Sequence, residues 1–328
     1  MTIKNEWLIE VDKLNIFFQS DKNPKPIHAV RDLSFTLKQG EMLGVVGESG
    51  SGKSITNLAL MGILGENSKV QAHLCQFNNR DLLNLSESQW QEIRGKEISM
   101  IFQDPMTALN PFLTVEFQIV ETILAHTRLT KKVAREKAID LLSLVGIPSP
   151  KERMKAYPFE LSGGMAQRVM IAMAISTSPK LLIADEPTTA LDVTIQKQIL
   201  MLLKSLQEKN NMSIILVTHD LGVVSEYSDR VQVMYAGEII ESGDTKSLIS
   251  HPHHPYTKGL LASRPGALIR EAKSKLPSIS GIVPAFHQRP SGCQFHPRCP
   301  IIQDNCSKMS IALENNVRCL YPLSEAHP

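Results

Sequence analysis

Length, composition and charge narrow the possible classes of protein before any motif is considered. The chain has 328 residues, of which 42% are hydrophobic and 21% charged, and its formal net charge is +2. A chain of this size can bury one large domain with an appendage, or two medium domains. The near-neutral charge argues against a main partner that is nucleic acid or an anionic membrane.

The sequence contains no stretch that predicts export or membrane insertion. Residues Met1 to Asp12 lack the apolar core of a signal peptide. No run of about 18 apolar residues occurs in the chain, so no segment has the pattern of a membrane-spanning helix. We therefore expect the chain to stay in the reducing cytosol, where structural disulfides are rare.

The N-terminal part of the chain alternates strand patterns with polar connections. Trp7 to Phe18 and Ala29 to Leu37 predict two strands, joined by a polar, proline-containing connection. Met42 to Val46 predicts a short buried strand. The spacing of apolar residues over Ser54 to Leu64 predicts a helix that ends near Gly65.

A glycine-rich loop lies between that buried strand and that helix. Its eight residues, GESGSGKS, fit G-x-x-x-x-G-K-[ST] in the strand–loop–helix context that makes the motif specific for phosphate. Glycines let backbone N–H groups surround phosphate oxygens, and the helix N-terminus adds a positive dipole end. The Lys53 ammonium would contact the β- and γ-phosphates, and the Ser54 hydroxyl would bind Mg²⁺. The candidate nucleotide-binding residues of the loop are Gly47, Ser49, Gly50, Ser51, Gly52, Lys53 and Ser54.

A helical segment separates this loop from two further buried strands. The pattern from Pro105 to Thr177 is helical. Leu181 to Ala184 and Ile214 to Val217 are continuous apolar runs, typical of parallel strands that are covered on both faces. Two helices are expected to bury an apolar face, made in the first by Val133, Ala138, Leu141, Leu142 and Val145 and in the second by Ile195, Ile199, Leu202 and Leu206.

The next element predicted is a hairpin. Its strands are Val231 to Tyr235 and Glu238 to Glu241, turning at Ala236-Gly237. Strands that alternate with helices predict an α/β fold with a twisted sheet. After His251 the periodicity weakens, so we expect one domain over residues 1–250 and an extension over 251–328.

Two acids follow the first of the continuous apolar strands. A buried strand delivers its last residues to the carboxyl edge of the sheet, where α/β proteins bind ligands. Asp185 would orient Mg²⁺ through water. Glu186 would be the general base for the attacking water, a role that contributes about 10²–10⁴-fold in rate. The alternative is that both acids only cap the turn at Pro187. His219 follows the second strand and would contact the γ-phosphate.

Three further motifs carry a resemblance to a known family. Leu161 to Gln167, with the sequence LSGGMAQ, resembles the signature loop of ABC ATPases. Gln103 resembles the family's Q-loop glutamine, residues 190–192 resemble its D-loop, and His219 resembles its switch histidine. These motifs occur in the family's order, and the resemblance covers essentially the whole chain.

The resemblance implies an ABC-type P-loop ATPase with a RecA-like core, an N-terminal antiparallel β subdomain and a helical insert at about 105–177. It implies that Glu186, His219 and Gln103 are catalytic, and that Mg²⁺ is held by Ser54, Gln103 and Asp185. Phe18 resembles the aromatic residue that stacks on adenine, with plain core packing as the alternative.

The resemblance also implies a head-to-tail dimer in which the signature loop contacts the γ-phosphate held by the partner. The loop begins a predicted helix, whose N-terminus favours an anion. The residues expected to serve the partner's nucleotide are Ser162, Gly163, Gly164 and Gln167.

Three segments are similar to the ATP-binding subunits of bacterial dipeptide and oligopeptide importers. They are residues 100–111 (MIFQDPMTALNP), 254–257 (HPYT) and 292–300 (GCQFHPRCP). This similarity implies a second, related ATPase in a heterodimer, two permeases, a substrate-binding protein and a peripheral location at the cytoplasmic face of the inner membrane. It implies no nucleic acid, and the segment after Gln103 would receive the permease's coupling helix. The alternatives are a subunit for another substrate, such as a metal complex or an exported drug, or a soluble ABC ATPase that acts with nucleic acid.

Four cysteines crowd into the C-terminal extension. Cys293, Cys299, Cys306 and Cys319 are separated by five, six and twelve residues. Four thiolates suit tetrahedral Zn²⁺ or an iron–sulfur cluster, and the spacing does not decide between them. The resemblance to peptide importers favours a [4Fe–4S] cluster, with Zn²⁺ or a metal-free tail as alternatives. Cys75 is expected to be a small buried hydrophobe.

Overall fold

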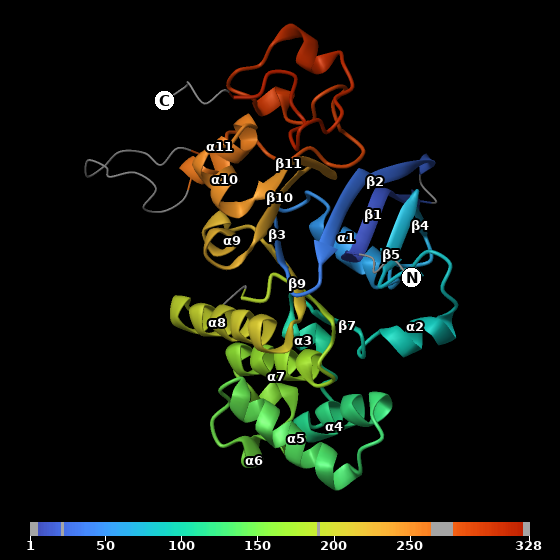
Figure 1. Cartoon of the computed structure of the whole chain (residues 1–328), viewed down its shortest axis with the longest axis vertical. Helices are drawn as coiled ribbons and strands as arrows, with labels where there is room; N and C mark the ends of the chain where they lie inside the picture. Colours follow the sequence, from blue (N-terminus) through green and yellow to red (C-terminus); the bar gives the residue numbers. More distant parts are fainter. Residues whose placement is uncertain (1–5, 21–22, 189–190, 264–277, 324–328) are drawn as a thin grey trace, which may run out of the picture. The chain divides into compact units, whose positions relative to one another are not determined.

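The chain forms two compact units. The computed structural model describes residues 6–20, 23–188, 191–263 and 278–323. The first unit takes its residues from 1–37, 42–84 and 217–328, and the second from 38–41 and 85–216. Figure 1 labels most of the helices and strands of both units.

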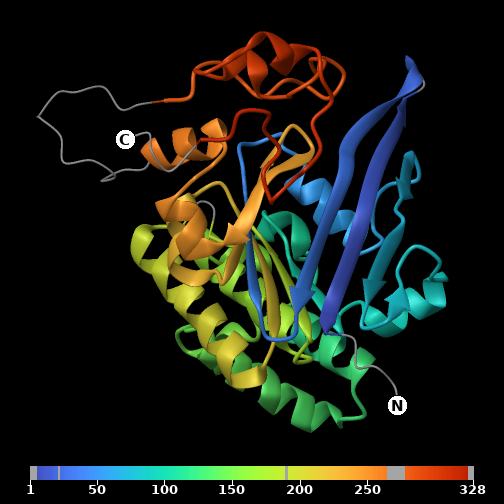
Figure 2. The same cartoon turned by 45° about the horizontal axis from the view of Figure 1, so that its top comes forward.

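An antiparallel sheet forms the N-terminal part of the first unit. Its strands are β1 (Trp7–Ser20), β2 (Asn23–Lys38), β4 (Ser68–Gln71), β5 (Leu74–Phe77) and β6 (Arg80–Asp81). They lie in the order β2–β1–β5–β6, with β4 also paired to β1, and Figure 2 shows β1 and β2 side by side. Strand β2 begins earlier than the sequence predicts. Pro26 is compatible with β2 because β2 is an edge strand, and proline within sheets is confined largely to edges.

The helix after the glycine-rich loop is shorter than predicted. Helix α1 runs over Lys53–Leu60. Gly62 follows with a left-handed φ of 62°. The Ile63 N–H then donates to the Leu58 carbonyl at 3.0 Å, the reverse hydrogen bond of a Schellman stop. The helix therefore ends at this glycine, not near Gly65.

A parallel strand pair and a hairpin continue the first unit. They consist of β3 (Met42–Val46), β10 (Arg230–Tyr235) and β11 (Glu238–Asp244). Strand β3 pairs in parallel with β10, which pairs antiparallel with β11, so the predicted hairpin is confirmed. Its turn residues Ala236 and Gly237 have φ values of 46° and 81°, as a two-residue type I′ turn requires. The Gly237 N–H donates to the Ser51 carbonyl at 2.8 Å, which joins the hairpin tip to the glycine-rich loop.

The C-terminal segment shares a hydrophobic core with this strand pair. Its elements follow β11 in the chain and are α10 (Thr245–Ser250), α11 (Pro255–Ala262) and the 3₁₀ turns η2 (His296–Arg298) and η3 (Asp304–Ser307), whereas α9 (Leu221–Tyr227) of the same unit precedes β10. The rings of Tyr256 and Phe295 lie 4.8 and 5.3 Å from the ring of Tyr235. All three belong to a buried cluster that includes Val46 of β3. Residues on both sides of position 250 therefore contribute to one core.

The second unit holds parallel strands whose side chains are all buried. Its strands are β7 (Ile98–Ile101), β8 (Leu181–Asp185) and β9 (Ser213–Thr218), and β9 crosses into the first unit at Val217. Strands β7 and β8 pair in parallel with Ile98 opposite Leu181. The continuous apolar runs therefore form buried strands, as predicted, and β8 is parallel to its neighbour β7. Helices α2 (Glu87–Ile93) and α8 (Val193–Asn210) also belong to this unit.

The predicted helical segment of the second unit is confirmed. It comprises α3 (Pro105–Ala108), α4 (Val115–His126), α5 (Lys131–Leu144), α6 (Pro150–Arg153), η1 (Pro158–Glu160) and α7 (Gly163–Ile175). Two details of the predicted apolar faces are wrong. Val133 is 44% exposed because it lies in the first turn of α5, beside the N-cap Thr130. In α8, Ile199 and Leu206 are buried as predicted, whereas Ile195 and Leu202 are half-buried and Leu203 is buried instead.

The helices of this chain are short or mixed in polarity. The longest that the structure describes, α8, has 18 residues and carries polar side chains along its length. Within the described ranges, no helix combines the length and the apolar character needed to cross a bilayer.

Candidate nucleotide-binding site

The glycine-rich loop adopts a conformation that only glycines allow at three positions. Gly50 and Gly52 have φ values of 81° and 99°, in the left-handed region that side chains disfavour. A Cβ on Gly47 would lie 2.2 Å from the Met234 carbonyl oxygen. Gly52 is the N-cap of α1 and contributes no side-chain cap. The backbone N–H groups that begin α1 are therefore available to an anion.

Lys53 lies at the centre of the loop's hydrogen bonds. Its side chain is buried, with a 6% exposed residue surface. The ammonium donates to the carbonyls of Gly47 and Glu48 at 2.7 and 3.0 Å, and to Ser51 Oγ at 3.4 Å. A cation enclosed by a curled backbone is suited to bind phosphate oxygens. Ser54 follows it in the first turn of α1 and is half-buried, whereas Ser49 is exposed.

The adjacent rings Phe17 and Phe18 of β1 differ in their surroundings. The ring of Phe17 stacks on the imidazole of His28, with centroids 4.2 Å apart. Burial, together with the charges of Arg31 and Arg289, lowers the pKa of His28 to about 4, so this imidazole is neutral at pH 7. Phe18 points to the other face of β1, because successive strand residues alternate, and it is half-buried. Phe18 is therefore the ring that remains a candidate for adenine stacking.

His219 lies at the carboxyl end of β9, where the sequence places it. The residue is exposed. The next residue, Asp220, caps α9 by accepting the Gly222 N–H at 2.6 Å, and its own N–H donates to Thr218 Oγ1 at 3.1 Å. The histidine is thus fixed in the turn between β9 and α9 within the first unit.

The second unit brings Gln103 and Glu186 together. Asp185 ends β8 and is 3% exposed, whereas Glu186 is half-buried. The Gln103 side-chain amide donates to Glu186 Oε2 at 3.2 Å. Glu186 has a φ of 48°, a conformation that is uncommon for a residue with a side chain and that concentrates at functional sites. A carboxylate oriented by an amide is suited to accept a proton.

The loop over Leu161 to Gln167 begins α7 as predicted. Ser162 is the N-cap, and its Oγ accepts the Met165 N–H at 3.3 Å. Ser162 and Gly163 are exposed, and a Cβ on Gly163 would meet nothing within 4 Å. The nearest atom to a Cβ on Gly164 would be Leu191 Cδ2, at 3.5 Å. The start of α7 therefore presents an open surface of backbone.

The Gln167 side chain forms a hydrogen bond within its own chain. The side chain is 1% exposed, and its amide donates to the Pro187 carbonyl at 2.7 Å. It thereby joins α7 to the turn that follows Glu186. Its expected contact with a partner's nucleotide stays a prediction. Of the predicted D-loop at 190–192, residue 190 lies outside the described ranges, and Asp192 caps α8 by accepting the Ile195 N–H at 3.0 Å.

Two residues that contact the glycine-rich loop were not predicted as site residues. The Tyr256 hydroxyl accepts the Glu48 N–H at 3.0 Å, and Arg298 forms an ion pair with the Glu48 carboxylate. Tyr256 lies in the HPYT segment and Arg298 in the cysteine-rich segment, both more than 200 positions away from Glu48 in the sequence. No spacing rule connects residues so far apart in the sequence, so sequence reasoning had no signal for these contacts.

The four C-terminal thiols approach one another without forming a metal site. The Cys293 N–H donates to the Cys306 carbonyl at 2.8 Å. Burial, together with the neighbouring Cys319, Cys299 and Cys306 thiols, raises the pKa of the Cys293 thiol to about 11. Among the residues that the structure describes, no three His, Cys, Asp or Glu side chains are grouped closely enough to hold a metal ion. As placed, the thiols therefore do not fit a bound metal or cluster.

Cys75 agrees with the prediction of a buried hydrophobe. It is 3% exposed, on β5. Burial and the charge of Asp81 raise the pKa of its thiol to about 12. The thiol is therefore protonated at neutral pH and packs as a small apolar side chain.

Two family models match this chain. Residues 30–189 match the model described as "ABC transporter". Residues 240–306 match the model described as "Oligopeptide/dipeptide transporter, C-terminal region". The first match contains the glycine-rich loop, Gln103, the signature loop and Glu186, and the second contains Tyr256 and Arg298.

Similar proteins and structures carry consistent descriptions. The dipeptide transport ATP-binding protein DppD of Escherichia coli is 49% identical over 324 residues, which span 97% of this chain and 98% of that protein. The oligopeptide transport ATP-binding protein AppD of Bacillus subtilis is 50% identical over 300 residues, 91% of this chain and 90% of that protein. Among solved structures, the dimeric bacterial ABC transporter cassette MJ0796 superimposes with a TM-score of 0.64 at 26% identity, covering 72% of this chain and 98% of that one.

Proposed function

Because this chain belongs to the ABC transporter family of ATP-binding proteins, we propose that it hydrolyses ATP to drive the import of dipeptides or oligopeptides. The observation that carries the proposal is the phosphate-binding loop, in which buried Lys53 is enclosed by carbonyls before the uncapped start of α1. Near full-length similarity to dipeptide and oligopeptide transport ATP-binding proteins supports the class of cargo. The alternatives of another cargo or of a nucleic-acid function have no such support.

We assign the residues of the cycle by their chemistry. The glycine-rich loop and Lys53 would bind the phosphates, and Phe18 would stack on adenine. Mg²⁺, held by Ser54, Asp185 and Gln103, would neutralise charge on the phosphates. Glu186 would accept the proton of the attacking water, oriented by the Gln103 amide that already donates to it. His219 would contact the γ-phosphate.

The assembly is also a proposal. The open N-terminus of α7, with Ser162, Gly163 and Gly164, would contact the nucleotide held by a second ATPase subunit, and a related cassette of known structure is dimeric. The full importer would add two permeases and a substrate-binding protein. We place the chain peripherally at the cytoplasmic face of the inner membrane.

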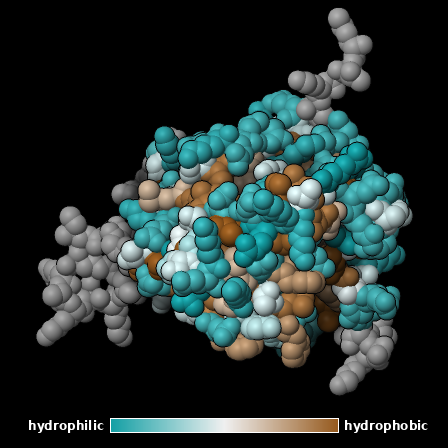
Figure 3. All heavy atoms as spheres, turned by 90° about the horizontal axis from the view of Figure 1, so that it is seen from below, coloured by the Kyte–Doolittle hydropathy of each residue, from teal (hydrophilic) through white to brown (hydrophobic). Residues whose placement is uncertain are grey.

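An apolar hollow on the helical insert is suited to dock a permease helix. Phe117, Val120 and Leu124 of α4 line a hollow of about 570 Å³. Phe112 and Phe159 of the same unit are 86% and 67% exposed. Figure 3 views the molecule from the end where Figure 1 draws α4, α5 and α6, and shows hydrophobic patches between hydrophilic ones. Exposed apolar patches of this kind mark interaction surfaces.

The iron–sulfur cluster remains a separate proposal. The donor set of four thiols supports it, and the described positions of the thiols do not. No step of the ATPase cycle depends on it.

The experiment that tests the function compares three variants of the assembled complex. Glu186→Gln is expected to retain ATP binding and to lose about 10²–10⁴-fold of its hydrolysis rate. Lys53→Ala is expected to lose ATP binding. Glu208→Gln, which changes an exposed acid of α8 in the same way, is the matched control and should behave as the wild type. Hydrolysis by the Glu186→Gln variant at the wild-type rate would refute the assignment of the base.

A further inference from the structure

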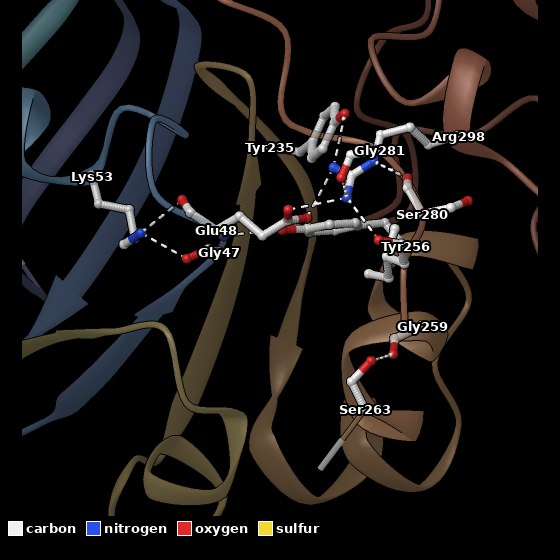
Figure 4. Close-up of polar contacts among 11 residues, drawn as sticks. Gly47, Glu48, Lys53, Tyr235, Tyr256, Gly259, Ser263, Ser280, Gly281 and Arg298 are labelled. Atoms are coloured by element: carbon white, nitrogen blue, oxygen red, sulfur yellow. Dashed lines mark hydrogen bonds and ion pairs between the residues drawn. The ribbon is translucent and has the colours of Figure 1, made fainter. Parts of the chain in front are cut away.

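The second residue of the phosphate loop is held by the C-terminal segment. The Arg298 guanidinium donates to both oxygens of the Glu48 carboxylate, each at 3.0 Å. The Arg298 side chain is 6% exposed and that of Glu48 is 29% exposed, so water screens this pair only partly. Figure 4 shows the Glu48 side chain pointing away from Lys53 and toward Arg298.

The guanidinium itself is fixed by the segment that carries it. Its Nε donates to the Ser280 carbonyl at 2.8 Å, and its Nη2 donates to the Ile279 and Gly281 carbonyls at 3.3 and 3.2 Å. It also donates to the Tyr235 hydroxyl at 3.3 Å. These bonds hold the planar guanidinium in one orientation. Its two terminal nitrogens then each donate to one oxygen of the Glu48 carboxylate, which makes the ion pair bidentate.

The backbone of Glu48 is held at the same time from two sides. Its N–H donates to the hydroxyl of Tyr256, whose side chain is fully buried. Its carbonyl accepts from the Lys53 ammonium at 3.0 Å. Glu48 therefore links the phosphate-binding lysine to two residues of the C-terminal segment, Tyr256 and Arg298 (Figure 4).

A carboxylate in a phosphate-binding loop opposes the binding of a polyanion. At a partly buried site, like charges several ångströms apart interact with an effective dielectric far below that of water. A bidentate arginine removes the net charge of the carboxylate and fixes it on the side of the loop that faces the C-terminal segment. The arginine thus acts on the nucleotide through Glu48.

We propose that Arg298 is a positioning residue for ATP, which neutralises Glu48 and holds it away from the phosphates, so that the C-terminal segment sets the nucleotide affinity of the loop. This inference rests on the proposed function, because it assumes that the loop binds ATP. A purely structural alternative is that the ion pair only fastens the C-terminal segment to the first unit. The two differ in what happens when both charges are removed.

The test measures the dissociation constant of Mg–ATP and the steady-state kinetics of the full-length protein in its complex. Arg298→Gln leaves Glu48 uncompensated and is expected to raise the dissociation constant and the KM for ATP roughly tenfold with little change in kcat. The double variant Arg298→Gln with Glu48→Gln is expected to return the affinity to within about threefold of wild type. The defect of the single variant should also shrink as salt concentration rises.

Two further variants keep the test decisive if Arg298→Gln folds poorly. Glu48→Asp retains the negative charge, but the shorter side chain cannot reach the Arg298 guanidinium. The uncompensated carboxylate should therefore weaken ATP binding. Glu48→Gln, although chemically less conservative, should bind ATP more tightly than Glu48→Asp. Arg318→Gln is the matched control: Arg318 also joins the C-terminal segment to β11, through the Ile239 carbonyl at 2.9 Å, but does not contact Glu48.

The outcomes separate the two hypotheses. Equal weakening by the single and double variants, or tighter binding by Glu48→Asp than by Glu48→Gln, would show a structural fastener and overturn the proposal. Unchanged affinity in Arg298→Gln would do the same. If the wild-type protein binds no ATP, or binds ATP no more tightly than the Lys53→Ala variant, the proposed function itself would instead be refuted.

Discussion

Acid is expected to destabilise the start of helix α11 through one buried histidine. His254 is 1% exposed, and its Nδ1 accepts the Tyr256 N–H at 3.0 Å as the N-cap of α11. Burial lowers the pKa of His254 from 6.5 to about 3. A proton on this ring would both remove the cap and bury a cation, so the folded protein takes up the proton much less readily than the unfolded chain.

The size of this effect follows from the two pKa values. Because the folded pKa lies below the unfolded one, the stabilisation is fully present above pH 6.5 and is lost as the pH falls toward about 3. At pH 4.5, two pH units below the unfolded value, the loss is about 2.7 kcal/mol of unfolding free energy. This is an upper value for one site.

The assay is urea unfolding at pH 7.5 and at pH 4.5 for the wild type and for His254→Asn. Asparagine can cap a helix but has no ring to protonate, so the variant should lose about 2–3 kcal/mol less between the two pH values. His28 titrates in the same window, but it does so in both proteins and cancels in the comparison. His251→Asn, at an exposed position nearby, is the control. Parallel losses of stability in the wild type and His254→Asn would refute the reasoning.

Three further predictions concern the loop, the signature helix and the thiols. Gly47→Ala should abolish ATP binding while the chain still folds, because its Cβ would lie 2.2 Å from the Met234 carbonyl oxygen; an equilibrium nucleotide-binding measurement checks this. Gln167→Leu should lower the unfolding free energy by about 1–3 kcal/mol, measured by urea unfolding, because the buried Pro187 carbonyl loses its donor. Metal analysis of protein purified without oxygen should give about four irons per chain if the cluster is present. That iron should fall in Cys306→Ser and stay unchanged in Cys75→Ser, and an iron content near zero in the wild type would exclude the cluster.

Local sequence rules predicted the site where the relevant contacts are short-range. The phosphate loop, the hairpin turn at Ala236-Gly237 and the N-cap Ser162 each depend on residues within a few positions of one another. Their backbone angles follow from side-chain size and from hydrogen bonds that the sequence makes visible. The end of α1 was misplaced because two glycines compete, and the first to adopt the left-handed conformation, Gly62, stops the helix.

The same rules could not find contacts between distant residues. Periodicity shows that α8 has an apolar face but not where its centre lies, so Leu202 was assigned in place of Leu203. The Glu48–Arg298 pair joins positions 250 residues apart, and each residue alone is an ordinary surface charge in sequence. The four C-terminal thiols are close together in the sequence, but their spacing does not fix their positions in space. Whether they can hold a metal depends on those positions, which are set by the fold of the whole segment.

The contacts of the C-terminal segment with Glu48 join a part of the chain found in peptide transporters to the ATP-binding loop that many ATPases share. The phosphate loop is common to many ATPases, whereas residues 240–306 match the model described as the C-terminal region of oligopeptide and dipeptide transporters. Within that match, Tyr256 supplies the acceptor for the Glu48 N–H and Arg298 supplies the counter-charge for its carboxylate. Arg298 directly precedes Cys299, so a change that moves this cysteine would be transmitted to the loop through a single peptide unit and an ion pair. A segment that matches the C-terminal region of peptide transporters is thereby in direct contact with the loop that ATP hydrolysis requires.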